Sequence, residues 1–429
     1  MSISRALFLR NGLFASTLAT ILLAGAAGGA AQSAAPAGNR AGSRVWNGTW
    51  ASSQQREELF GQPDAEDFSN ASIRQFVHLS TGGARLRIHL SNVFGVSPLR
   101  IRAVHVARAV SPAACKIDAA TDRQLTFSGE TGVEIPPGAE FVSDPVDFDA
   151  APLSELAITL YMDGPPAHQT GHPGSRTTSC SVPGNLITAA EFPHAAKFEQ
   201  WFYISAVDVQ ARPQSASIVV LGDSITDGHA TTTNGNDRWT DVLAERLQAE
   251  PALKGLGVLN QGIGGNHLLI DGIGANAVSR LDRDVLAQTG VKYLIVLEGI
   301  NDLGGLTRTG PVSPQEHQDL VRRMTQALRQ IVVQAHAHGI RVYGATIMPD
   351  GGSAYYHPDA ANDEDREAVN DWIRAPGHFD AVIDLDKAMR DPAQPDRLAP
   401  QYDSGDHLHP GPAGYKAMGD AVPLPLFSE

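Results

Sequence analysis

Five mostly apolar segments in the second half of the chain restrict its fold more than any other feature. Each is too continuous to alternate between a buried and an exposed face, which is typical of strands covered on both sides. Such strands occur in parallel sheets that have helices packed on both faces. We therefore predict a three-layer, flavodoxin-like α/β domain with a parallel sheet over residues 214–429. The expected strands are 217–221, 258–260, 293–297, 341–347 and 381–385.

Helices are expected between these strands. The clearest covers residues 313–338, where Ser313 supplies an N-cap oxygen and Glu316 completes a capping box. Gly339 follows, in the position where glycine commonly ends a helix. A second amphipathic helix is expected over residues 238–247.

Residues 44–210 follow a different pattern, the two-residue period of strands with one buried face. Residues 86–90 alternate between apolar and polar side chains, and Gly82 and Gly83 separate them from an apolar run at 73–79. This pair of segments predicts a β-hairpin. Turns rich in proline and glycine punctuate the rest, so we predict a β-sandwich or jelly-roll-like domain ahead of the α/β domain.

The first residues have the pattern of an export signal. Arg5 and Arg10 precede an apolar run at about 13–27, which is shorter than the roughly 20 residues of a membrane span. We predict a signal peptide at 1–31, a disordered lead-in at 32–43 and a secreted or periplasmic protein. No stable membrane insertion is expected after cleavage.

Charge and cysteine content narrow the possible partners. The formal net charge of −14 argues against a nucleic-acid partner, because phosphate binding needs clustered Lys and Arg. The two cysteines, Cys115 and Cys180, could form a disulfide in an oxidising compartment or remain as two buried thiols. The sequence leaves both possibilities open.

Four short motifs follow the expected strands in order. Ligands of an open parallel sheet bind beyond the carboxyl ends of its strands, so loops that carry such motifs should converge on one crevice. Together the motifs resemble the signature blocks of the SGNH (GDSL-type) hydrolases. They are Gly222-Asp223-Ser224 within 218–227, Asn260-Gln261-Gly262-Ile263-Gly264-Gly265, Glu298-Gly299-Ile300-Asn301-Asp302, and Asp406-His407-Leu408-His409.

The resemblance implies a catalytic triad. A serine hydroxyl needs a base within hydrogen-bond reach and a third group that orients the base. Ser224 would be the nucleophile, His409 the base and Asp406 the orienting carboxylate. The family pattern Asp-x-x-His before Pro selects His409, whereas His407 is interpreted as a structural or pocket-lining residue. The resemblance requires no metal and no organic cofactor.

The resemblance also implies an oxyanion hole, a set of donors for the negative charge that an attacked ester carbonyl develops. The expected donors are the backbone N–H groups of Ser224 and Gly265 and the side-chain amide of Asn301. The family's Asn-x-x-x-x-Gly spacing, counted from Asn260, selects Gly265 over Gly264.

Substrate contacts and a metal site are weaker hypotheses. A metal site at His357, Asp359 and Asp363 is disfavoured because these residues lack the spacing of known metalloenzyme motifs. Loop residues beyond two strand ends are candidate substrate contacts, with ordinary loop positions as the alternative. These candidates are His267, Tyr355 and Tyr356.

The segments 46–51 and 90–95 resemble those of a bacterial subgroup of secreted SGNH esterases with a β-rich N-terminal domain, some of which are grouped with xylan-deacetylating enzymes. We therefore expect a serine ester hydrolase that forms an acyl-enzyme and acts on short acyl esters, O-acetyl esters of carbohydrates above all. The substrate would be a small molecule or a glycan ester. An acyltransferase with the same acyl-enzyme and a non-catalytic glycan-binding protein are the alternatives.

Overall fold

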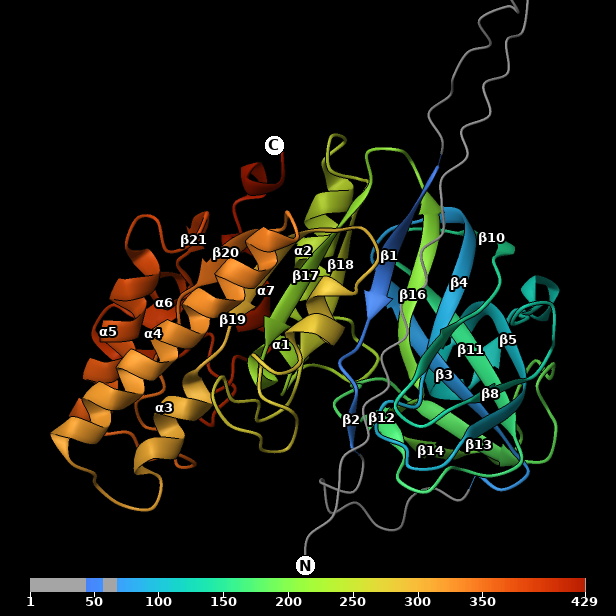
Figure 1. Ribbon diagram of the computed structural model, residues 1–429, viewed down its shortest axis with the longest axis horizontal. Helices are drawn as coiled ribbons and strands as arrows, with labels where there is room; N and C mark the ends of the chain where they lie inside the picture. The colour runs from blue at the N-terminus through green and yellow to red at the C-terminus, as the bar shows by residue number, and fades with distance from the viewer. Residues whose placement is uncertain (1–43, 57–67, 429) are drawn as a thin grey trace, which may run out of the picture. The chain divides into compact units, whose positions relative to one another are not determined.

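The computed structural model describes residues 44–56 and 68–428 (Figure 1). The predicted signal peptide at 1–31 and the lead-in at 32–43 lie outside the described residues. Within the described ranges, no helix is both long enough and apolar enough to cross a bilayer.

A parallel sheet of five strands forms the second half of the chain, in the order β18-β17-β19-β20-β21. Every residue of the interior strand β17 is buried, so both faces of the sheet are covered at this strand. All five predicted strands are present. They are β17 (Ala216–Gly222), β18 (Leu256–Gly262), β19 (Val291–Leu297), β20 (Arg341–Ala345) and β21 (Ala381–Ile383).

Two groups of helices pack on this sheet. Helices α2 and α7 contact each other, and α2 packs on β18, whereas α4 and α5 contact each other and β20. The predicted capping box of α4 is present, because the Ser313 backbone N–H donates to Glu316 Oε2 over 2.8 Å. The longer helices are α2 (Trp239–Ala249), α3 (Ile300–Thr307), α4 (Pro314–Ala337), α5 (Ala360–Arg374) and α7 (Pro412–Ala421).

Two larger antiparallel sheets that share one core make up most of the first half of the chain. One has the order β1-β16-β4-β10, and the other includes β14-β13-β3-β11-β5. The β-rich domain is thus present, and its jelly-roll connectivity stays a prediction. The strands are β1 (Val45–Ala51), β3 (Ala71–Leu79), β4 (Gly83–Ser91), β5 (Leu99–Ser111), β10 (Val146–Ala150), β11 (Ser154–Met162), β13 (Ser179–Pro183), β14 (Ala196–Phe198) and β16 (Ile204–Ala211).

The predicted β-hairpin across Gly82 and Gly83 is wrong. Strand β3 pairs with β11 and β13, whereas β4 pairs with β16 and β10, so the two strands belong to different sheets. Their apolar side chains meet in the shared core rather than along a common edge. Glycine is needed at the crossing, because a Cβ on Gly82 would lie 2.5 Å from the Ala150 carbonyl oxygen.

A disulfide joins Cys115 to Cys180, whose Cα atoms are 6.1 Å apart. Cys180 lies on β13, and Cys115 follows the short turn after β5. The bond therefore closes a 65-residue separation within the β-rich part.

Strand β1 connects the two halves of the chain. The Gly48 backbone N–H donates to Ser217 Oγ at the start of β17 over 3.1 Å and to the Thr289 carbonyl over 3.1 Å. A Cβ on Gly257 of β18 would lie 2.0 Å from the Gly48 carbonyl oxygen, so the close contact requires glycine there. All described residues belong to one compact unit.

Candidate active site

Ser224 lies at a sharp turn from strand β17 into the short helix α1 (Ser224–Asp227). Asp223 caps this helix, because its Oδ1 accepts the Ile225 backbone N–H over 2.9 Å. A Cβ on Gly222 would lie 2.2 Å from Thr226 Oγ1, so only glycine allows the turn to be this tight. The turn presents the serine hydroxyl at the carboxyl end of the sheet.

The predicted triad residues form a continuous hydrogen-bonded series. Ser224 Oγ lies 2.8 Å from His409 Nε2, and His409 Nδ1 lies 2.6 Å from Asp406 Oδ2. Both Ser224 and His409 are buried, with 8% and 9% of their surface exposed. Residues that are 185 positions apart in the chain thus lie in contact, in the arrangement that activates a serine hydroxyl.

Asp406 is held in its ionised form. Its Oδ1 accepts the backbone N–H groups of Leu408, over 2.9 Å, and His409, over 2.8 Å. Burial raises the pKa of Asp406, but the bonds from the His409 ring and from these two N–H groups outweigh it and lower the pKa below the usual range. The carboxylate therefore favours a proton on Nδ1 of His409 and leaves Nε2 free to accept the serine proton.

His407 occupies a different position from the base. Its Nδ1 lies 2.5 Å from Asp403 Oδ2, its side chain is 48% exposed, and its backbone is left-handed at φ 60°. The histidine and Asp403 brace the loop that carries Asp406, as the structural interpretation of His407 predicts.

The three predicted oxyanion donors come from three loops. Within the described residues, the backbone N–H groups of Ser224 and Gly265 have no acceptor. Gly265 has a left-handed φ of 66°, which favours glycine at this position. Asn301 Nδ2 donates to the Asn266 carbonyl over 2.6 Å, and because an amide nitrogen carries two hydrogens, the other remains for a ligand.

Tyr356 positions this amide. Its hydroxyl donates to Asn301 Oδ1 over 2.5 Å, and its side chain is buried behind Asn301. This bond orients the Asn301 amide, with Oδ1 toward the Tyr356 hydroxyl and Nδ2 toward the Asn266 carbonyl. A Cβ on Gly304 would lie 2.2 Å from the Tyr356 ring, so this glycine of α3 makes room for the tyrosine. Tyr356 is therefore a positioning residue and not the substrate contact that we expected from the sequence.

The other two candidate contacts, Tyr355 and His267, differ in their exposure. Tyr355 is 52% exposed, and the Arg308 guanidinium lies 4.1 Å from the centre of its ring. His267 is half-buried, directly after the oxyanion loop, and its Nδ1 has no hydrogen-bond partner in the described part of the chain. Tyr355 is therefore open to a ligand, whereas Nδ1 of His267 is buried and only part of that residue is exposed.

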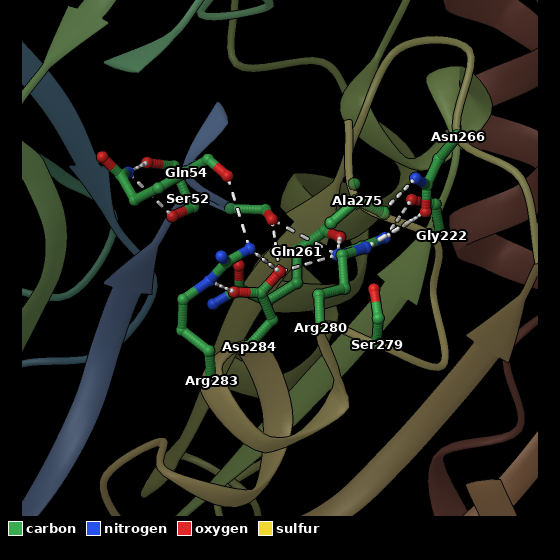
Figure 2. Close-up of polar contacts among 12 residues, drawn as sticks. Ser52, Gln54, Gly222, Gln261, Asn266, Ala275, Ser279, Arg280, Arg283 and Asp284 are labelled. Carbon is green, nitrogen blue, oxygen red and sulfur yellow. Dashed lines mark hydrogen bonds and ion pairs between the residues drawn. The ribbon is translucent and has the colours of Figure 1, made fainter. Parts of the chain in front are cut away.

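The Arg280 side chain contacts residues of three of the four motifs, and Figure 2 shows it with Gly222, Gln261 and Asn266. Its guanidinium donates to the Gly222 carbonyl over 3.0 Å and to the Gln261 carbonyl over 2.7 Å. It also donates to Asn266 Oδ1 over 2.8 Å and pairs with Glu298 over 3.2 Å. Its side chain is fully buried. Sequence analysis did not identify this residue. Its only sign in the sequence is that a charged side chain stands in a segment whose positions 277, 278, 281 and 285 are apolar.

Buried acids surround the same arginine. Burial raises the pKa of Glu298 well above its usual value, and the neighbouring Asp223 raises it further. Burial also raises the pKa of Asp223 to about 7. Asp302 accepts the backbone N–H groups of Leu268, over 2.7 Å, and Leu269, over 3.0 Å, which ties the end of the oxyanion loop to α3.

The β-rich half contributes directly to the support of the nucleophile. His172, on β12 (Thr170–His172), places Nε2 2.9 Å from Asp227 Oδ1 and Nδ1 2.8 Å from the Ser53 carbonyl. The Ser53 hydroxyl also donates to Asp284, which pairs with Arg280 over 3.0 Å. The contact of His172 with Asp227 therefore supports the helix that follows the nucleophile, and the contact of Ser53 with Asp284 supports the ion pair of Arg280.

His229 lies beside the base. Its ring centre is 4.1 Å from that of His409, and burial, followed by the charges of His409 and Arg176, lowers its pKa. One ligand atom each from His229, Asp406 and His409 lie within 4.8 Å of one another. This group could hold a metal ion, but only in competition with the hydrogen bonds of the triad.

A buried serine, a histidine and a carboxylate in series, next to two backbone N–H groups without acceptors, define the site of a serine hydrolase. A sequence model of the GDSL-like lipase/acylhydrolase family matches residues 220–417, which include the four motifs from Ser224 to His409. The chain therefore contains a domain of this family, and the family and the site together identify an ester hydrolase.

Similar solved structures cover about half of the chain. A lipolytic protein of the G-D-S-L family from Desulfitobacterium hafniense DCB-2 is 22% identical over 48% of this chain and 97% of its own, with a TM-score of 0.36. A variant of an acetyl xylan esterase from Geobacillus stearothermophilus is 22% identical over 48% of this chain and 92% of its own, with a TM-score of 0.35. No curated protein matches the chain.

Proposed function

We propose that the protein is a secreted or periplasmic serine esterase that removes short acyl groups, in particular O-acetyl groups, from carbohydrates. The observation that carries the catalytic part is the series of hydrogen bonds from Ser224 Oγ through His409 to Asp406. The disulfide between Cys115 and Cys180 supports an oxidising compartment. The polar side chain of His229, whose ring centre lies 4.1 Å from that of His409, suits a polar leaving group.

The reaction follows from this geometry. His409 Nε2 accepts the proton of Ser224 Oγ as the oxygen attacks the ester carbonyl, and the carbonyl oxygen becomes an anion. The N–H groups of Ser224 and Gly265 and the Asn301 amide stabilise that anion. Collapse breaks the bond to the alcohol, which takes the proton from His409 and leaves an acyl-serine. Water then attacks the acyl group in the same way, with His409 again as base, and releases the acid.

Release of p-nitrophenol from acetate, butyrate and octanoate esters tests the proposal, together with acetate release from acetylated xylan. We expect the wild type to prefer acetate and Ser224→Ala to lose all turnover. Ser279→Ala, which changes an exposed serine, is the control and should behave as wild type. Turnover that persists in Ser224→Ala would exclude the mechanism. Acyl transfer to an added sugar in place of hydrolysis would favour the acyltransferase alternative.

A further inference from the structure

Arg176 is a half-buried arginine that the β-rich half places next to the catalytic base. It lies between β12 and β13 with a left-handed φ of 48°, and its carbonyl accepts the Asn234 backbone N–H over 2.9 Å. Its Nη2 lies 3.4 Å from Nδ1 of His229, whose ring packs on His409. The guanidinium is therefore one imidazole ring away from the base. Non-glycine residues in this strained conformation are concentrated at functional sites.

Within the described residues, the charge of this arginine has no acidic partner. Its Nε is buried without a hydrogen-bond acceptor, and no ion pair forms between Arg176 and any described carboxylate. Two carboxylates, those of Asp406 and Asp227, tend to raise the pKa of the adjacent His229. Each is already bonded to another histidine, Asp406 to His409 and Asp227 to His172. A guanidinium stays protonated in proteins, and leaving a buried donor such as Nε unpaired is costly. An anionic ligand would relieve this cost.

The position of Arg176 indicates which part of a substrate it faces. His409 returns its proton to the leaving alcohol, so that alcohol must lie close to the His409 ring. His229 packs against the same ring, whereas the oxyanion donors Gly265 and Asn301 come from other loops. A group on the alcohol side of the ester is therefore nearer to Arg176 than a group on the acyl side.

We propose that Arg176, together with His229, binds a carboxylate on the alcohol part of the substrate, so that acetyl esters of acidic sugars are preferred to those of neutral sugars. This inference rests on the proposed esterase function. A guanidinium can bind both oxygens of a carboxylate at once. His229 accepts the Arg176 bond at Nδ1, so its neutral ring carries the proton on Nε2 and presents a second donor. The depressed pKa of His229 keeps the ring in this neutral form.

Two small acetyl esters that differ by one negative charge test the inference. 4-Acetoxybenzoate and its methyl ester both release acetate and a phenol, but only the first carries a carboxylate on the alcohol part. Each kcat/KM is divided by the rate of base-catalysed hydrolysis of the same ester, which removes the difference in leaving-group reactivity. We expect the wild type to prefer the carboxylate about tenfold at low salt, as one charge-assisted bond allows, and less at high salt.

Matched variants assign the preference to Arg176. In Arg176→Gln the normalised ratio should fall to about one. Arg176→Lys keeps the charge but not the planar guanidinium that binds both carboxylate oxygens, so it should retain part of the preference. Arg322→Gln, which removes an exposed charge from α4, should keep the wild-type ratio. Thermal melts show whether each variant is folded. Acetate release from acetylated polygalacturonate and acetylated xylan then extends the comparison to glycans.

The outcomes separate this inference from the function on which it rests. If wild type hydrolyses p-nitrophenyl acetate through Ser224 but shows no preference for the carboxylate, the esterase function stands and the inference is wrong. An unchanged ratio in folded Arg176→Gln would also overturn it. If the wild type hydrolyses none of these esters, the proposed function fails and the inference fails with it.

Discussion

His172 Nε2 lies 2.9 Å from Asp227 Oδ1, and both side chains are almost completely buried. The bond joins a strand of the β-rich half to the last residue of the helix that begins with Ser224. A Cβ on Gly174, in the loop after this strand, would lie 2.0 Å from the Asp227 carboxylate, so glycine there leaves room for the carboxylate. The β-rich half therefore helps to hold the nucleophile in place.

We expect His172→Ala to lower kcat with little change in KM. The loss of the bond leaves Asp227 buried without its partner and lets the helix shift, and a displacement of about 1 Å can cost about 100-fold in rate. His172→Gln, which can still donate to Asp227, should recover part of the rate. His194→Ala, at an exposed position of the same half, is the control. An equal loss of kcat in His172→Gln and His172→Ala would contradict a positioning role.

The amide of Asn301 offers a graded test of the oxyanion hole. Asn301→Ala removes one donor and should lower kcat by about 10²–10³-fold. Tyr356→Phe removes only the bond that orients the amide, so we expect a smaller decrease in kcat, and Tyr161→Phe, which removes a hydroxyl bond to Asn70 in the β-rich half, serves as the control. Steady-state kinetics on p-nitrophenyl acetate would measure all three. A larger loss in Tyr356→Phe than in Asn301→Ala would be inconsistent with this order.

Asp223 should make stability depend on pH. Burial raises its pKa to about 7 from 3.8, and Asp302 adds to the effect, while the Ile225 N–H, His409 and Arg280 oppose it. A carboxyl with a raised folded-state pKa contributes stability that is fully present below its unfolded pKa and is lost as the pH rises through the folded pKa. The loss should therefore occur between about pH 4 and about pH 7.

The variant Asp223→Asn isolates this effect. Asparagine keeps an oxygen acceptor for the Ile225 N–H but carries no charge, so its Tm relative to wild type should be higher above neutral pH than below pH about 4. Asp371→Asn, at an exposed position, should show no such change. Thermal melts across the pH range would measure both. A Tm difference that does not vary with pH would show that Asp223 does not change its protonation in this range.

Reduction of the disulfide should destabilise the protein without removing any residue of the triad. A bond that closes a 65-residue separation stabilises a fold by about 2–4 kcal/mol, largely by restricting the unfolded chain. We expect a lower midpoint of urea unfolding in reducing buffer and in the double variant Cys115→Ala, Cys180→Ala. The double variant should not respond to reductant. If reductant shifts the two proteins equally, its effect does not come from this bond.

The residues that sequence analysis placed correctly follow local rules. The strands from β17 to β21 are continuous apolar runs, and α4 begins at a capping box, so both can be predicted from neighbouring residues. The contact between Ser224 and His409 spans 185 residues and was accessible only through the family motifs. The distance between the two side chains could be established only from the structure.

The features that sequence analysis missed depend on packing between distant segments. Strands β3 and β4 have the alternation of a hairpin, but alternation does not tell whether neighbouring strands pair or face each other across a core. Arg280, His172 and Arg176 are single polar residues without a periodic pattern. Apart from Asp284, which lies four residues after Arg280, their side-chain partners lie at least 14 residues away in the chain, so no local rule finds them.

The bridges from Ser53 to Asp284 and from His172 to Asp227 have a practical consequence for anyone who shortens the gene. The change of pattern near residue 213 invites expression of residues 214–429 alone, and that fragment would retain every triad and oxyanion residue. It would nevertheless lose Ser53 and His172, expose Asp227 and leave one edge of the parallel sheet without β1. The segment that contains all catalytic motifs of this hydrolase is thus shorter than the smallest fragment that we expect to be active.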